Sequence, residues 1–377
     1  MLSFLRIQES PIHAECEIPE FAGIIGYRTT IKFYIKNIII LIIIFLINTT
    51  FNYAAANDTL TKKVTTLVEN TDADVSIPIE KFRYAGDQRF TIDGSLPLKE
   101  SKIKPLNTII LGTIVTGGLV GLHIMMQNAW WKNSRGGFHF EEDFVSALQV
   151  DKAGHSYVAY LSSYAANEAL LTSGFSYDAS AIIGSAMGLG FETMIEIEDG
   201  FSKDWGFSPS DFYFDLAGAT FFLAQHYVPA LQNITPKWTY FPTEWTGQPV
   251  LNRPRNIGDD YNSSAFWWSI NVHNILPDNF KNFWPKWLNI ALGYGGNAID
   301  ANPDPNGPPD QLSVRRYMIA LDYNMVQLLP DGCPFWNWCK QTMNIFKFPA
   351  PTIEFSKTGT RFYLMYPFRF KLGGIKF

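Results

Sequence analysis

The sequence predicts an α+β fold, in which an apolar four-helix bundle with a buried polar cluster is followed by a C-terminal antiparallel β-rich region. Two observations predict the bundle. Residues 105–126 form a long apolar run, and the next three apolar segments each carry a short stripe of charged residues. A third observation predicts the β-rich region, because apolar side chains recur at every second position in several stretches after residue 236.

The composition favours an envelope protein in contact with a membrane. Of the 377 residues, 47% are hydrophobic, 15% are aromatic and 17% are charged. The charged share of a typical soluble domain is roughly 25%. The net charge of −5, without a basic patch that contains interleaved aromatic residues, excludes nucleic acid as an expected partner. We expect a membrane or a lipid-like ligand as the partner, and the sequence names no protein partner.

Residues 1–56 have the pattern of an N-terminal extension followed by a signal peptide. Lys32 and Lys36 precede an unbroken apolar stretch at 38–47, and alanines at 54–56 fit the small-residue cleavage pattern. This stretch is half the roughly 20 residues that cross a bilayer, which favours a cleaved signal over an anchor. We expect translation to start near residue 31 and the mature chain to be exported, to the periplasm or the periplasmic side of the outer membrane. The alternative is a cytoplasmic extension before an uncleaved anchor.

Residues 57–104 are polar and show no sustained hydrophobic period, which predicts a linker with one short strand near residues 89–92. Residues 105–235 follow as the predicted helical bundle. Its first segment, 105–126, is long enough to cross a membrane and equally suited to a buried helix. Glycines along this segment would let another helix approach closely.

Three further helices are predicted at residues 143–172, 178–198 and 209–228. Their polar stripes consist of Asp151, Lys152 and His155 on the first, Glu192, Glu196 and Asp199 on the second, and Asp211 and Asp215 on the third. Spacings of three and four residues place each stripe on one face of its helix. Because carboxylates on apolar helices are costly without partners, we expect the stripes to face one another. Other acidic residues of these segments are expected to be solvated: Glu168, Asp178 and Asp204.

Residues 236–377 are predicted to form the β-rich region. Alternating patterns predict strands at residues 287–294, 317–323 and 362–370, with turn-rich insertions such as 300–310 between them. Four to six strands are too few for a closed barrel, of which the smallest ordinary single-chain form has about eight. We therefore expect a curved sheet packed on the bundle. Cys333 and Cys339 are expected to form a local disulfide in an exported chain.

The polar stripes resemble the pattern of a bacterial family. The motifs are Asp151-Lys152-x-x-His155, Glu196-x-x-Asp199, and Ser210-Asp211 followed by Asp215-x-x-Gly218. This order resembles the YfiM-like predicted periplasmic lipoproteins of unknown function, and is similar to that of VanZ-like proteins linked to glycopeptide resistance. The resemblance covers residues 145–225 and implies an envelope location. The chain differs in having no lipobox cysteine and in its β-rich region, so lipidation is not implied.

The candidate site comprises Asp151, Lys152, His155, Glu196, Asp199, Asp211 and Asp215. One interpretation is a divalent metal site, because imidazole and carboxylate ligands suit zinc or manganese. The ligands would then be His155, Glu196, Asp199 and Asp215.

Two other interpretations stand beside the metal site. In a hydrolase acting on a lipid or cell-wall intermediate, His155 would be the general base, oriented by Asp151 or Glu196, and Lys152 would stabilise an anion. In a structural network, Lys152 and His155 would neutralise the carboxylates and fix the register of the helices. We adopt the structural interpretation, which expects no resident cofactor and a structural or lipid-binding protein rather than an enzyme.

Overall fold

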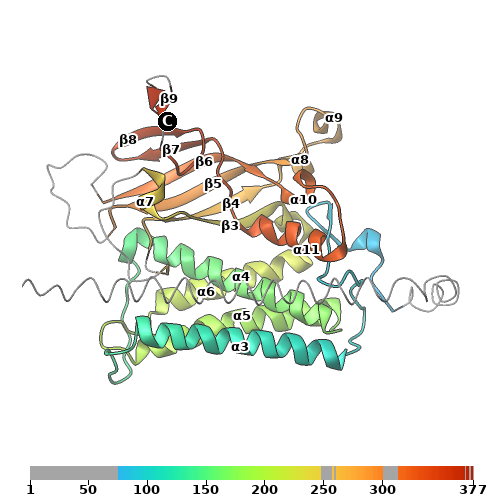
Figure 1. Ribbon diagram of the computed structural model, residues 1–377, viewed down its shortest axis with the longest axis horizontal. Coiled ribbons are helices and arrows are strands. Elements are labelled where there is room, and N and C mark those ends of the chain that lie inside the picture. The colour runs from blue at the N-terminus through green and yellow to red at the C-terminus, as the bar shows by residue number, and fades with distance from the viewer. Residues whose placement is uncertain are drawn as a thin grey trace, which may run out of the picture. The chain divides into compact units, whose positions relative to one another are not determined.

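A layer of long helices lies against a six-stranded antiparallel sheet in the computed structural model of the chain (Figure 1). This arrangement confirms the predicted α+β class. The structure describes residues 75–247, 257–258, 260–299, 313–369, 371–372 and 375–376. The predicted signal peptide, its cleavage site and the expected start of translation lie outside the described residues.

Three helices form the packed part of the helical layer: α4 (Val150–Thr172), α5 (Tyr177–Gly200) and α6 (Pro209–Tyr227). Two serines fix where helices begin. The side chain of Ser176 accepts a hydrogen bond from the N–H of Ala179 at the start of α5, and Ser208 accepts one from the N–H of Asp211 at the start of α6. The predicted start of the third striped helix therefore agrees with the structure.

Glycines let these three helices approach one another closely. A Cβ atom on Gly218 of α6 would lie 2.0 Å from the carbonyl oxygen of Ser156 on α4. A Cβ atom on Gly188 of α5 would lie 2.2 Å from the Oγ of Ser163, also on α4. Because no side chain fits at either position, these glycines set the distance of α5 and α6 from α4.

Helix α3 (Pro105–Ala129) lies along this layer (Figure 1), and Met126 is its one buried residue. Met126 near its C-terminus contacts Ile195 of α5. Most of its length is exposed, with Leu106 and Ile109 at 68% and 66%. Among the residues that the structure describes, α3 is the one helix long and apolar enough to cross a membrane. Three helices rather than four share the packed interior, so the four-helix bundle is not confirmed.

Residues 75–104 pack on the helical layer, although a linker was predicted there. They contain η1 (Ile79–Lys81) and a hairpin of β1 (Arg83–Tyr84) and β2 (Asp87–Gln88). The predicted strand near residues 89–92 is therefore misplaced. Ala85 and Gly86 have positive φ angles and make the tight turn of this hairpin earlier in the chain.

The sheet has the strand order β3-β4-β5-β6-β7-β8, with every neighbouring pair antiparallel. The strands are β3 (Ile234–Tyr240), β4 (Ser264–Ile270), β5 (Leu288–Asn297), β6 (Val314–Tyr323), β7 (Thr352–Ser356) and β8 (Gly359–Tyr363). The strands predicted at 287–294 and 317–323 correspond to β5 and β6. The strand predicted at 362–370 is wrong beyond Tyr363, because residues 365–368 form a turn that contains Pro367, which has no N–H for a sheet ladder.

Short elements complete the described chain: η2 (Ser146–Gln149), η3 (Pro229–Asn233), α7 (Thr243–Thr246), α8 (Val272–Ile275), α9 (Asp278–Lys281), α10 (Met325–Leu328), α11 (Pro334–Thr342), η5 (Met343–Ile345), β9 (Lys371–Leu372) and β10 (Ile375–Lys376). Cys333 and Cys339 are free thiols, so the predicted disulfide is wrong. Cys333 caps the N-terminus of α11 and Cys339 lies six residues further along. Six helical residues rise about 9 Å, which exceeds the roughly 7 Å that a disulfide can join.

The helical layer meets an aromatic face of the sheet. The ring of Tyr157 on α4 lies 6.1 Å from that of Trp238 on β3 and 5.8 Å from that of Phe266 on β4. The Tyr157 hydroxyl also donates a hydrogen bond to the carbonyl of Ile345. The α4 helix is therefore held between the sheet on one side and the other helices on the other.

The opposite face of the sheet is covered by the chain itself. Residues 346–350 run from the β3 edge to β7, and the N–H of Lys347 donates to the carbonyl of Trp238. The ammonium of Lys347 lies 5.2 Å from the ring centroid of Trp267, which also faces this side. Tyr366 contacts Trp267 as well, at 5.4 Å between rings. The face opposite the helical layer is thus covered, whereas α4 covers its own face only over β3 and β4, and Leu292 and Ile319 on that face stay exposed.

Candidate functional site

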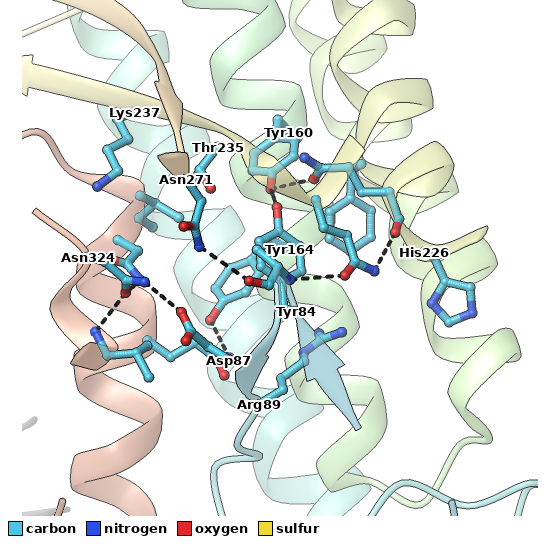
Figure 2. A pocket seen from close by; sticks show the side chains of 18 of the residues that line it. Tyr84, Asp87, Arg89, Tyr160, Tyr164, His226, Thr235, Lys237, Asn271 and Asn324 are labelled. Carbon is cyan, nitrogen blue, oxygen red and sulfur yellow. Dashed lines mark hydrogen bonds between the residues drawn. The ribbon is translucent and has the colours of Figure 1, made fainter. Parts of the chain in front are cut away.

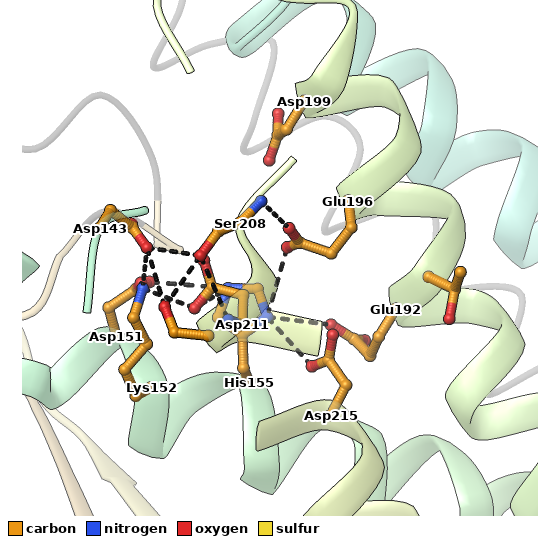
Figure 3. Close-up of polar contacts among 12 residues, drawn as sticks. Asp143, Asp151, Lys152, His155, Glu192, Glu196, Asp199, Ser208, Asp211 and Asp215 are labelled. Atoms are coloured by element: carbon orange, nitrogen blue, oxygen red, sulfur yellow. Dashed lines mark hydrogen bonds and ion pairs between the residues drawn. The ribbon is translucent and has the colours of Figure 1, made fainter. Parts of the chain in front are cut away.

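The three polar stripes meet at one end of the helical layer (Figure 3). They come from the first two turns of α4, the C-terminal half of α5 and the first two turns of α6. Because α5 runs antiparallel to its neighbours, its last turns lie beside the first turns of α4 and α6. The stripes therefore face one another in a single cluster, as the i,i+4 spacing predicted.

His155 lies at the centre of the cluster, and its Nδ1 atom faces three carboxyl groups. This atom lies 3.1 Å from Oδ1 of Asp215. It lies 3.9 Å from Oε2 of Glu192 and 3.8 Å from Oε1 of Glu196. One ring nitrogen is thus surrounded by acidic groups from both α5 and α6.

The Nε2 atom of His155 faces a second pair of carboxyl groups. It lies 3.6 Å from Oδ1 of Asp211 and 3.8 Å from Oδ1 of Asp151. The hydroxyl of Tyr261 donates a hydrogen bond to this Asp151 oxygen at 2.6 Å. The imidazole therefore separates two groups of carboxylates.

Lys152 neutralises only the second group. Its buried ammonium lies 2.5 Å from Asp143, 2.9 Å from Asp151 and 2.6 Å from Asp211. Three carboxylates around one ammonium hold the pKa of Lys152 above its ordinary value, although burial by itself would lower it. Ser208 adds a hydroxyl that donates to Asp143 at 2.6 Å.

Asp143 belongs to the cluster although sequence reasoning placed it outside the stripes. It lies in the loop before α4, and the next residues Ala147, Leu148 and Gln149 have positive φ angles. This left-handed backbone turns the chain so that Asp143 returns to Lys152. No helical period signals such a contact, which is why the sequence did not reveal it.

Asp199 lies away from the histidine. Its carboxylate accepts a hydrogen bond from the indole N–H of Trp131 at 2.5 Å. Glu196 is closer, but its second oxygen accepts from the backbone N–H of Ser208 at 3.0 Å. Two of the four predicted metal ligands, Glu196 and Asp199, thus have other hydrogen-bond partners.

The cluster contains an excess of acidic groups. Six carboxyl groups lie within 4 Å of the cationic side chains of Lys152 and His155, and Asp199 lies further out: the six are Asp143, Asp151, Glu192, Glu196, Asp211 and Asp215. Within the part of the chain that the structure describes, Oε1 of Glu192 and Oδ2 of Asp215 are buried without a hydrogen-bond partner. Buried acceptors without a donor are costly. These two oxygens are therefore where an additional cation would be stabilised most.

Burial raises the pKa of several acidic groups of the cluster. It raises the pKa of Glu192 to about 8 and that of Glu196 to about 9. It also raises the pKa of Asp211 to about 6, where the charge of His155 opposes the effect. Burial alone would lower the pKa of His155, but the hydrogen bond to Asp215 and the charge of Asp151 raise it well above its usual value. Without a further cation, the cluster therefore retains protons at neutral pH.

Two sets of three residues have the geometry of a metal site. In one, ligand atoms of His155, Glu192 and Asp215 all lie within 4.8 Å of one another, and in the other the same holds for Asp151, His155 and Asp211. In the second set, Asp151 and Asp211 already form ion pairs with Lys152, and Asp151 accepts a hydrogen bond from Tyr261. The first set holds both unpartnered oxygens, and its imidazole and carboxylate donors fit zinc or manganese. Glu192 thus joins His155 and Asp215 as a candidate ligand, in place of the predicted Glu196 and Asp199.

The comparisons with known proteins cover this same part of the chain. A family model described as "Predicted periplasmic lipoprotein (DUF2279)" matches residues 137–226. The matched segment runs from the loop before α4 to the end of α6 and holds every carboxyl group of the cluster. This similarity is consistent with an exported protein of the cell envelope. No curated protein and no solved structure matches the chain.

A separate cavity of about 80 Å³ lies toward the C-terminal ends of α4 and α6, beside the β1–β2 hairpin (Figure 2). Its lining groups largely satisfy one another. The hydroxyl of Tyr160 donates to Gln225 at 2.8 Å, and the amide of Asn324 donates to Asp87 at 2.5 Å. This cavity differs from the acidic cluster in that most of its hydrogen-bonding groups already have partners.

Proposed function

We propose that the chain is an exported envelope protein whose helical layer binds one divalent metal ion through His155, Glu192 and Asp215. One observation carries the proposal: Glu192 and Asp215 each hold a buried oxygen without a partner, while the other oxygen of each lies 3.9 Å and 3.1 Å from Nδ1 of His155. A divalent cation would satisfy both oxygens and offset the acidic excess. The structural network preferred from the sequence leaves these oxygens unsatisfied, so the geometry favours the metal.

The residues around the three ligands would hold them in place. Asp211 and Asp151 face the other nitrogen of His155 and would keep a proton there when Nδ1 binds the ion. Glycine contacts between α4, α5 and α6 fix the distances between the helices that carry the ligands. A bound ion would act as a Lewis acid toward a water molecule or a ligand oxygen.

The test is metal content and metal binding of the purified full chain. We expect about one zinc or manganese ion per chain by elemental analysis, and loss of titratable binding in Asp215→Asn and Glu192→Gln. Asp178→Asn is the matched control, because Asp178 is an exposed carboxylate on α5 that pairs with His226. Binding that survives in both ligand variants, or none in the wild type, would contradict the proposal.

A hydrolase acting on a lipid or cell-wall intermediate is a second candidate, and the position of Glu196 favours it. Its carboxyl group lies 3.8 Å from His155 and has a pKa raised to about 9 by burial, so it carries a proton at neutral pH. A protonated carboxyl beside a metal site can act as a general acid. Glu196→Gln should then keep the metal and lose hydrolysis of a para-nitrophenyl phosphodiester, whereas equal hydrolysis by both forms would exclude this role.

A further inference from the structure

The sheet face that packs on α4 over β3 and β4, and whose Trp268 contacts Phe221 of α6, leaves apolar side chains exposed along the other strands. One row of directly opposed residues runs across five strands, and each member is between 41% and 49% exposed: Trp268, Leu292, Ile319, Ile353 and Phe362. We call this row and its neighbours on the same face, Leu321 and Phe355, the apolar band. Exposed apolar surface of this extent marks a site of interaction.

The opposite, buried face of the same strands combines apolar core residues such as Trp267 and Met318 with ion pairs. Lys237 pairs with Asp322 at 2.7 Å, and both side chains are almost completely buried. Glu354 lies 3.8 Å from Arg316 and 3.2 Å from Arg361. Strand β6 alternates between buried and exposed positions from Val314 to Asp322. Buried ion pairs on one face and a largely apolar exposed face on the other depart from the usual order of a water-exposed sheet, and match a sheet whose exposed face contacts lipid.

Aromatic residues flank the apolar band at both strand ends. Trp287 stacks on Tyr323 at one end, at 6.4 Å between rings, and Tyr294 contacts Tyr317 at the other, at 5.5 Å. Tyr323 lies six positions after Tyr317, which corresponds to about 20 Å along a strand. The apolar band of an outer-membrane sheet is about 25 Å tall and is bordered by aromatic residues in the same way.

We propose that the apolar band contacts the acyl chains of a lipid bilayer. The exposed helix α3 supports lipid over a second copy of the chain. It lies on the far side of α4–α6 from the sheet (Figure 1), so an interface on one face would leave the other apolar surface in water. A bilayer provides apolar surroundings for both surfaces.

The acidic cluster lies at the edge of the apolar band. Val150, next to Asp151, packs with Tyr294 in a buried group at the Tyr294 end of the strands, and the Tyr294 hydroxyl donates to the carbonyl of Leu148. The cluster is thus level with the flanking aromatic residues, outside the acyl-chain region. The proposal concerns the sheet and stands independently of the metal.

Site-specific fluorescence quenching tests the proposal. The full chain, with Cys16, Cys333 and Cys339 replaced by Ser, receives a single fluorophore through Ile319→Cys or Ile353→Cys in the apolar band. The matched control is Ile275→Cys, because Ile275 is an isoleucine of α8 that is 56% exposed but lies off the strands of the sheet. Each protein is reconstituted into phosphatidylcholine–phosphatidylglycerol vesicles that contain lipid with a quencher deep in the acyl chain.

We expect quenching several-fold stronger at positions 319 and 353 than at position 275. Equal quenching at all three positions would overturn the proposal. A stable dimer in which positions 319 and 353 are shielded from an aqueous quencher without lipid would also overturn it, and would assign the apolar band to a second copy of the chain. Melting curves of the labelled proteins exclude misfolding as the cause of either result.

Discussion

At the scale of the residue, the chemistry of the site follows from an imbalance of charge, because two cationic side chains face a larger number of carboxyl groups. Lys152 contacts three carboxylates and is itself completely buried, whereas Glu192 and Asp215 have only His155 beside them. The two halves of the cluster therefore differ in whether their carboxyl groups are neutralised. The half around Lys152 is a satisfied ion network, and the half around Glu192 needs a cation or a proton.

Replacing the lysine should destabilise the fold. Lys152→Met keeps the length of the side chain but leaves Asp143, Asp151 and Asp211 without their shared counter-ion. We expect the free energy of unfolding to fall by about 3–5 kcal/mol, as for other broken buried ion pairs. Denaturant unfolding measures this loss. Lys203→Met, at an exposed lysine, serves as control and should change stability by less than about 0.5 kcal/mol.

The raised pKa of Glu192 predicts how stability depends on pH in chelator-treated protein. The ordinary pKa of the group is 4.5 and that in the folded chain is about 8, so the folded chain holds this proton more tightly than the unfolded chain. Raising the pH from about 5 to 9 should therefore favour unfolding, by on the order of 3 kcal/mol. Melting temperatures across this range should fall, and should fall less in Glu192→Gln. A stability that rises with pH would contradict the assignment.

At the scale of the element, small residues decide whether the stripes can meet. The Gly218 Cα of α6 lies so close to the Ser156 carbonyl of α4 that a methyl group has no room. A helix displaced at this point would carry Asp215 away from His155, since both lie within one turn of the contact. The geometry of the site therefore depends directly on how closely α6 packs against α4.

Gly218→Ala should consequently reduce both stability and metal binding. We expect a loss of about 2–3 kcal/mol, because overpacking forces the backbones apart. Gly190→Ala is the control, since nothing lies within 4 Å of a Cβ atom there and alanine favours the helix by up to about 1 kcal/mol. Thermal unfolding and metal titration should show a lower melting temperature and weaker binding for Gly218→Ala, but an equal or higher melting temperature and unchanged binding for Gly190→Ala.

At the scale of the whole molecule, Glu168 joins three separate parts of the chain. It was expected to be solvated, but its side chain is 1% exposed. It pairs with Arg89 at 2.5 Å and accepts a hydrogen bond from the indole N–H of Trp338 at 3.0 Å. The expectation was wrong because residues 75–104 and α11 cover this face of α4, and neither could be placed there from the sequence.

Glu168→Gln should loosen the segment before α3. The variant keeps the shape of the side chain but leaves the buried guanidinium of Arg89 without a counter-charge, for which we expect a cost of about 3 kcal/mol. Amide hydrogen exchange should increase in residues 82–104 more than in α5. Glu80→Gln, at an exposed position of the same segment, is the control. Unchanged exchange in residues 82–104 would show that Arg89 does not hold the segment in place.

The sequence by itself determined the features that depend on local spacing. The i,i+4 stripes, the serine cap at Ser208 and the period of β5 and β6 are set by neighbouring residues, and the structure contains all of them. The order of the motifs likewise led to predicted periplasmic lipoproteins, and a family model with that description matches residues 137–226, although the YfiM-like naming and the similarity to VanZ-like proteins are not confirmed.

Only the tertiary structure decided which surfaces are covered and which ligands are free. An alternating strand has two faces, and its sequence does not say which one the chain will cover, so the burial of Asp322 and the exposure of Ile319 could not be read from β6 alone. In the same way, Trp131 and Ser208 reach Asp199 and Glu196 from distant positions, which leaves Glu192 as the carboxylate beside His155. These outcomes depend on contacts between segments far apart in the chain, and such contacts have no local signature.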